Sequence, residues 1–209
     1  MRRPLMLLLA TATAAAAGIG AGAAPALASA PAAAGSTLTV TYPVNGSTFI
    51  NKVNSTVTLG PGKLVATANL TTLALTANLS LPPATGTFTE FGFIPVTATT
   101  RLIQDGKVTG KLSPTGNSVT TTATETLQLT ALNIGGLPVP VGNACETSPT
   151  RITVASQPGF NVLKGGTLTG TYTIPPFAHC GLATVLINLT LPGPGNTISL
   201  TLGQAKLGG

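Results

Sequence analysis

Apolar residues alternate with threonine, serine and asparagine along most of the chain. Leu38, Val40 and Tyr42 are each separated by one threonine, and the apolar residues of segment 73–81 share one face in the same way. The same period of two recurs in segments 53–59, 96–103, 127–131, 168–174, 185–191 and 198–202. This period predicts half-buried strands, with apolar side chains toward a core and threonine toward solvent. Beyond residue 30 no segment keeps apolar residues at helical spacing for three turns, so the sequence predicts an all-β protein.

Glycine and proline mark turns between these segments at intervals of roughly 8–12 residues, the spacing of short strands in all-β domains. Asn45-Gly46 and Asp105-Gly106 are strong hairpin signals, and the second would join segment 96–103 to segment 107–112. Many short strands separated by such turns favour a β-sandwich or a barrel. We predict one β-sandwich-like domain over residues 36–209, with roughly eight to eleven mainly antiparallel strands.

Residues 1–28 have the three parts of a secretory signal peptide. Two arginines follow the initiator methionine, an apolar alanine-rich stretch comes next, and Ala26-Leu27-Ala28 fits the small-x-small cleavage rule. We predict cleavage after Ala28, because a cut after Ala30 would leave a proline beside the scissile bond. The alternative is an uncleaved anchor, which the low transfer energy of alanine, glycine and threonine disfavours. Residues 29–35 are then a flexible lead-in, and we expect no stable membrane span in the mature chain.

The mature chain carries few charges. Without the two leader arginines, eight of the ten basic residues remain against four acidic ones, a net charge of +4. Charged residues make up 7% of the sequence, against roughly 25% in an average soluble domain. The basic residues are scattered singly and form no stripe, which argues against nucleic-acid binding. Such a surface resists self-association weakly, so it belongs either to a secreted protein of biased composition or to one that lies against the envelope or other copies of itself.

The two cysteines of the sequence both lie in the mature chain. An even number in an oxidising compartment predicts a disulfide, Cys145–Cys180. Closing a loop of this length stabilises a fold by roughly 3–4 kcal/mol in the chain-entropy model. The adjacent Glu146 and His179 raise the alternative of a metal site, but neighbouring ligands chelate awkwardly and oxidation removes both thiolates. We therefore expect a structural disulfide and no metal.

Groups for enzymatic catalysis are scarce. A Ser-His-Asp arrangement would have to use the single histidine and the single aspartate, and there is no G-x-S-x-G motif. A glycosidase pair could come from Glu90, Glu125 and Glu146, but sugar clefts usually hold aromatic platforms and the chain has no tryptophan and only two tyrosines. We interpret each carboxylate as a solvated surface group. We therefore predict a protein that is not an enzyme and needs no cofactor.

The densest apolar feature is the aromatic cluster Phe88, Phe91 and Phe93. It could line a pocket for a lipid or another apolar molecule, because ligand pockets are mostly apolar with a few polar groups. The alternative interpretation is an ordinary sandwich core.

The whole chain resembles uncharacterised secreted all-β proteins of actinobacteria such as streptomycetes. The resemblance rests on the Arg-Arg and polyalanine leader, the Thr/Leu-rich strands, segment 135–142 before Cys145, and a second cysteine near the end. It covers most of the chain, but its motifs are compositional. It implies secretion and an all-β fold, and no binding or catalytic residue can be carried over from it.

Low charge, threonine-rich outer faces and few catalytic groups together favour a secreted, non-enzymatic module. We predict a structural, adhesive or binding role at or outside the cell envelope, with an envelope component or a second copy as partner. The alternative is a carrier of a lipid or other apolar small molecule, with Phe88, Phe91 and Phe93 near its pocket. The third hypothesis is an extracellular hydrolase that uses Glu90, Glu125 or Glu146.

Overall fold

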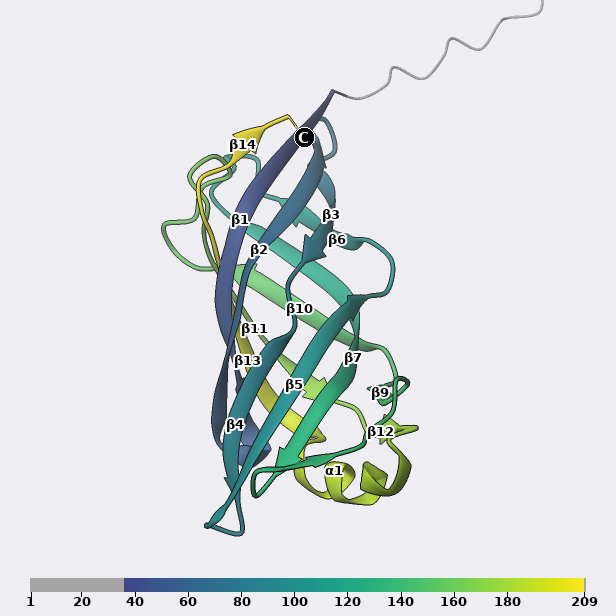
Figure 1. Ribbon diagram of the computed structural model, residues 1–209. Helices are drawn as coiled ribbons and strands as arrows, with labels where there is room; N and C mark the ends of the chain where they lie inside the picture. The colour runs from purple at the N-terminus through teal and green to yellow at the C-terminus, as the bar shows by residue number, and fades with distance from the viewer. Residues whose placement is uncertain (1–35, 209) are drawn as a thin grey trace, which may run out of the picture. The chain divides into compact units, whose positions relative to one another are not determined.

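The computed structural model describes residues 36–208, in which fourteen strands form one antiparallel sheet (Figure 1). The strands are β1 (Thr37–Ile50), β2 (Ser55–Asn69), β3 (Ala74–Ser80), β4 (Ala84–Glu90), β5 (Ile94–Gln104), β6 (Val108–Leu112), β7 (Val119–Ile134), β8 (Leu137–Val139), β9 (Glu146–Thr147), β10 (Thr150–Ser156), β11 (Gly166–Ile174), β12 (Phe177–Ala178), β13 (Gly193–Leu202) and β14 (Lys206–Leu207). The helices are η1 (Asn51–Val53), η2 (Gly181–Ala183) and α1 (Thr184–Thr190). The predicted cleavage site at Ala28 and the lead-in 29–35 lie outside the described residues.

Eight strands close into a barrel. Their order is β10-β11-β13-β1-β2-β3-β6-β7, and β7 pairs back onto β10. Two packed sheets were predicted, so the structure corrects the sandwich to a single sheet closed on itself, with more strands than expected. The alternation itself is confirmed, because inward positions such as Val40, Leu129 and Leu200 are buried while the threonines between them are more exposed. Closure pairs β10 with β7, so neither end of this eight-strand path is a free edge.

The β4–β5 pair extends the wall of the barrel at the end where α1 lies (Figure 1). β5 pairs with the second half of β7, and β4 follows β5 at the edge of the sheet. There β4 lies against β2, where Ser55 Oγ donates a hydrogen bond to Thr87 O at 2.8 Å. Gly86 permits this approach, since a Cβ at that position would lie 2.6 Å from a methyl group of Val57. Next to β2, strands β3 and β6 therefore form the wall in one half of the barrel. Strands β4 and β5 form the wall in the other half.

Asp105-Gly106 is not the hairpin turn that the sequence predicts. β5 and β6 do not pair with each other; both pair with β7 and follow one another along it. The Asp-Gly corner is the break between them, with Gly106 at a φ of 81°. The hairpin prediction fails because β7 offers one long partner edge, and pairing with it satisfies both flanking strands.

Asn45-Gly46 likewise lies inside a strand. β1 continues through it, with an irregularity in its register against β2 between Val44 and Gly46. A Cβ on Gly46 would lie 2.2 Å from Ser199 O on β13. The glycine therefore serves the close approach of a neighbouring strand at a bulge, which is the other common use of glycine in sheets.

Segment 185–191, predicted as a strand, forms α1 and lies at the end of the barrel opposite β14 (Figure 1). A short apolar run does not distinguish a strand from a helix, so the sequence pattern was ambiguous here. Ile187 is the buried residue of α1. Asn188 fixes the helix to β12, because its side chain accepts a hydrogen bond from Phe177 N at 2.7 Å and donates one to Phe177 O at 2.9 Å.

The predicted disulfide Cys145–Cys180 is confirmed. Both cysteines are completely buried, and the bridge connects the segment before β9 to the residue before η2. We call residues 177–191, which follow the barrel strand β11 and cover its end, the cap. No helix within residues 36–208 is long and apolar enough to cross a membrane.

Candidate functional site

Three cavities lie in series within the described part of the chain. Cavity 1 is about 80 Å³ and lies between β2, β4, β5 and the cap. Cavity 2, about 140 Å³, lies in the half of the barrel closed by β3 and β6. Leu102, Ile152 and Ile198 line both, so these three side chains separate them. Cavity 3, about 140 Å³, lies between the β4–β5 hairpin and α1 and shares Phe88 and Leu191 with cavity 1.

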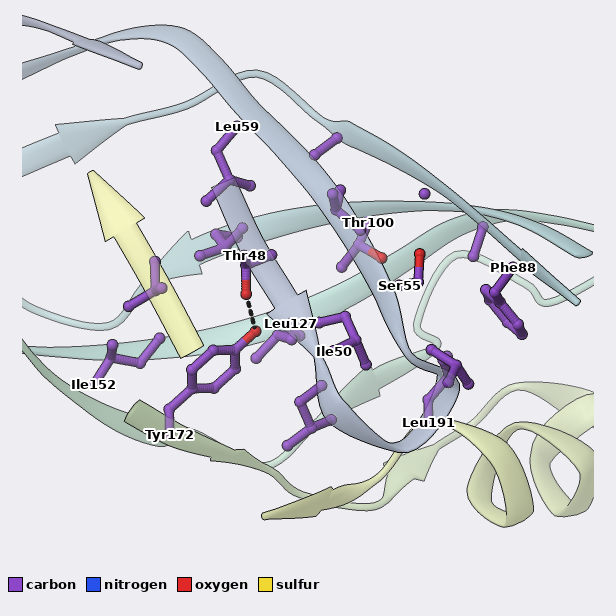
Figure 2. A pocket seen from close by; sticks show the side chains of 18 of the residues that line it. Thr48, Ile50, Ser55, Leu59, Phe88, Thr100, Leu127, Ile152, Tyr172 and Leu191 are labelled. Carbon is purple, nitrogen blue, oxygen red and sulfur yellow. Dashed lines mark hydrogen bonds between the residues drawn. The ribbon is translucent and has the colours of Figure 1, made fainter. Parts of the chain in front are cut away.

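Of the four hydroxyl groups that line cavity 1, those of Thr48, Ser55 and Tyr172 are hydrogen-bonded within the protein (Figure 2). Thr48 Oγ1 donates to Thr197 O at 2.8 Å, so the 2.7 Å contact with Tyr172 is one in which the tyrosine hydroxyl donates. Ser55, as described above, is bonded to β4. Burial raises the pKa of Tyr172, only partly offset by the hydrogen bond to Thr48, and its phenol therefore stays neutral at physiological pH. The rest of the wall is mostly aliphatic, so cavity 1 offers a ligand little but apolar contact.

Cavity 2 is aliphatic apart from Tyr42, Thr121 and Glu125. The hydroxyl of Tyr42 donates to Val162 O at 2.6 Å, so it is already paired. Glu125 is 3% exposed, and its Oε1 has no hydrogen-bond partner, which is true of no other buried side-chain nitrogen or oxygen in residues 36–208. Glu125 was predicted to be a solvated surface group, and the structure corrects that interpretation.

The backbone register explains why Glu125 is inside and alone. It occupies the inward parity of β7, two residues before the buried Leu127. It faces Thr150 on β10 and Gln104 on β5 in the register. Thr150 Oγ1 donates to Thr173 O at 2.9 Å, and Gln104 Nε2 and Oε1 are bonded to Gly106 O and to Leu79 N. Both polar neighbours are therefore engaged elsewhere.

The isolation of Glu125 shifts the pKa of its carboxyl. Burial raises the pKa of Glu125 to about 7, with a smaller contribution from the carboxylate of Asp105. Asp105 lies at the exposed corner between β5 and β6, where its Oδ2 accepts a hydrogen bond from Thr126 Oγ1 at 2.7 Å. No lysine, arginine or histidine is among the described residues that line cavity 2. The carboxyl thus changes its charge near neutral pH in a wall without compensating cations.

The aromatic cluster is split by the structure. Phe88 lines cavities 1 and 3, as the pocket hypothesis requires, and Figure 2 shows its ring at one side of cavity 1. Phe91 is 75% exposed and lines cavity 3, whereas Phe93 is 76% exposed and lines none of the three cavities. The two exposed rings belong to the turn between β4 and β5.

The candidate catalytic carboxylates are separated. Glu90 lines cavity 3, Glu125 lines cavity 2, and Glu146 belongs to β9 beside the disulfide. No two of them line the same one of these cavities. His179 precedes Cys180 at a φ of 60° and is exposed. Within residues 36–208, no group of three or more His, Cys, Asp and Glu side chains is arranged to hold a metal ion.

The alternation along β7 could have placed Glu125 inside the barrel, because Leu127 and Leu129 share its side of the strand. A glutamate side chain, however, is usually exposed to solvent. The cavities themselves have no sequence signal, because they depend on closure of the sheet. Comparison with protein-family models, curated proteins and solved structures finds no match to this chain. The function is therefore inferred from the cavities.

Proposed function

We propose that the protein binds a small apolar molecule inside its barrel and acts as an extracellular carrier. The observation that carries this proposal is the pair of apolar cavities in series, of about 80 and 140 Å³, inside a closed wall of strands. The disulfide and the predicted signal peptide support an extracellular site of action. This was the alternative hypothesis from the sequence, and the interior of the barrel now favours it.

Empty space inside the barrel costs free energy. Protein interiors are packed as densely as organic crystals, with few voids larger than a water molecule. A void costs on the order of 24 cal/mol per Å³ in mutational series, so cavity 2 alone corresponds to about 3 kcal/mol. A ligand would recover part of that cost through dispersion contacts.

The size of cavity 2 and its access from the surface determine which class of ligand it can bind. A dry cavity of about 150 Å³ lined by aliphatic and aromatic side chains is known to bind benzene, and cavity 2 is of this size. Leu70, on the turn after β2, lines cavity 2 and is 48% exposed, so the lining reaches the surface there. A ligand longer than one ring would extend into cavity 1 by displacing the three partition side chains.

Filling cavity 2 tests the proposal. Ala77 lines it from β3, while Ala74 lies exposed on the same strand. We expect Ala77→Leu to weaken toluene binding roughly tenfold or more, since the added carbons occupy ligand space, and Ala74→Leu to leave it unchanged. Titration calorimetry and the ligand-dependent rise of Tm measure both. If toluene and its alkyl homologues fail to bind the wild type, the carrier function is ruled out.

The structural or adhesive role stays a prediction, and one observation favours it as a second function. On the cap, three large apolar side chains are exposed: Leu182 is fully exposed, and Val185 and Leu189 are 71% and 67% exposed. Such surfaces mark interaction sites. We expect the wild type to self-associate at micromolar concentration and the triple serine variant of these residues to sediment as a monomer. A wild type that is monomeric throughout and binds no isolated cell wall would contradict this role.

A further inference from the structure

The carboxyl of Glu125 gives cavity 2 a specific chemical preference. Among the described residues that line cavities 1 and 2, it is the only carboxyl, and no lysine, arginine or histidine accompanies it. The tyrosine hydroxyls of these cavities donate within the protein, Tyr42 to Val162 O and Tyr172 to Thr48 Oγ1. Glu125 alone has an acceptor oxygen, Oε1, that is buried and free.

The fold cannot supply the missing donor from nearby. The cross-strand neighbours Thr150 and Gln104 are bonded to Thr173 O and to atoms of the β3 and β5–β6 segments. The remaining lining of cavity 2 is aliphatic and aromatic apart from Thr121, whose hydroxyl makes no hydrogen bond to Glu125. A buried polar group without a partner costs free energy, and a buried charge without one costs more. No side chain of the wall donates to Oε1, so a molecule inside the cavity can supply the donor.

Resting on the proposed function, we propose that cavity 2 binds a small apolar amine, whose ammonium group donates a hydrogen bond to Glu125 while its hydrocarbon part packs against the aliphatic wall. A neutral alcohol also donates a hydrogen bond but leaves the carboxylate charge uncompensated. A carboxylate ligand meets a like charge and no cation. The wall therefore ranks ligands of one shape in the order amine, alcohol, hydrocarbon, carboxylate.

Hydrogen bonds to charged groups are the stronger class in proteins. Their net contribution corresponds to roughly a tenfold to hundredfold change in affinity. Dispersion contacts with the ring are common to every ligand of the same shape, so comparing head groups isolates the contribution of Glu125.

The test uses benzylamine, benzyl alcohol, toluene and benzoate with the intact, disulfide-bonded protein at pH 8. We expect benzylamine to bind roughly tenfold to a hundredfold more tightly than toluene, and benzoate not to bind. Glu125→Gln should remove the preference for the amine while changing toluene affinity by less than about threefold. Glu90→Gln is the matched control, because Glu90 lines cavity 3, and it should leave every affinity unchanged.

The outcomes separate this inference from the proposed function. If toluene binds, Ala77→Leu weakens it, and benzylamine is no tighter, the amine preference is wrong while the carrier function stands. If Glu90→Gln rather than Glu125→Gln removes the preference, the amine binds in cavity 3 and the assignment to Glu125 fails. If no member of the series binds, both proposals fail.

Discussion

Replacing Glu125 by glutamine is expected to raise the free energy of unfolding by about 3 kcal/mol at pH 8 and to leave it almost unchanged at pH 4. The reason is the buried carboxyl, whose pKa is raised from an ordinary 4.5 to about 7 by burial and then by Asp105. Each pKa unit of difference between the folded and unfolded states corresponds to about 1.4 kcal/mol. Glutamine has nearly the same shape and does not titrate.

The direction of this change in stability with pH follows from the number of protons that the folded and unfolded states bind. Between pH 4.5 and about 7 the folded protein keeps a proton on Glu125 that the unfolded chain has already lost. The contribution of this group to stability is complete below pH 4.5 and is lost as pH rises through about 7. The wild type should therefore lose about 3 kcal/mol across this window relative to Glu125→Gln, a Tm difference of about 6–12 °C at pH 8.

Denaturant unfolding of the oxidised protein at a series of pH values measures this difference. Glu125→Leu extends the test, because it removes the unpaired Oε1 as well as the charge and should be the more stable variant at every pH. Asp105→Asn should move the window to lower pH, since it removes the second cause of the raised pKa. A wild-type curve parallel to that of Glu125→Gln from pH 4 to pH 8 would contradict the burial of an unpaired carboxyl.

Alternation predicted several of the individual strands, but it wrongly made segment 185–191 a strand, and it did not reveal the closure of the sheet. Alternation reports that one face of a strand is buried, and a strand such as β2 shows the same alternation in a sandwich or in a barrel. Closure depends on β7 pairing with β6 and β10 through its first half, which is a long-range relation between segments. The sequence showed only segment 127–131 of this strand clearly, since threonine fills most positions before it.

Local turn chemistry was overruled where tertiary pairing offered more hydrogen bonds. Asp105-Gly106 has the composition of a two-residue hairpin turn, yet the strands on both sides of it pair with β7. Glu125 shows a different conflict. Its position in the alternation of β7 predicted an inward side chain, whereas its charge predicted an exposed one. Conflicts between local preference and fold are expected at functional sites, which is consistent with a role for Glu125 in binding.

Removing the disulfide with Cys145→Ala and Cys180→Ala is expected to lower the free energy of unfolding by about 3–4 kcal/mol. The bridge spans 35 residues and encloses the barrel strands β10 and β11, so its loss frees a long loop in the unfolded chain. It also frees the cap, which then keeps the short β9–β12 pairing, the Asn188 side chain and the packing of its buried residues Phe177, Ala183 and Ile187. The cap should therefore lose more stability than the strands far from it.

Denaturant unfolding measures the total loss, and native-state hydrogen exchange locates it. We expect amides of α1 and β12 to exchange much faster in the double variant, while those of β1 and β2 change only with global stability. Asn188→Ala is the matched comparison, because it removes the two hydrogen bonds to Phe177 with the bridge intact and should cost about 1–2 kcal/mol. Unchanged protection of α1 in the double variant would show that the remaining hydrogen bonds and packing hold the cap without the bridge. In that case the cap would close the barrel independently of redox state, and ligand affinity should be equal in the oxidised and cysteine-free proteins.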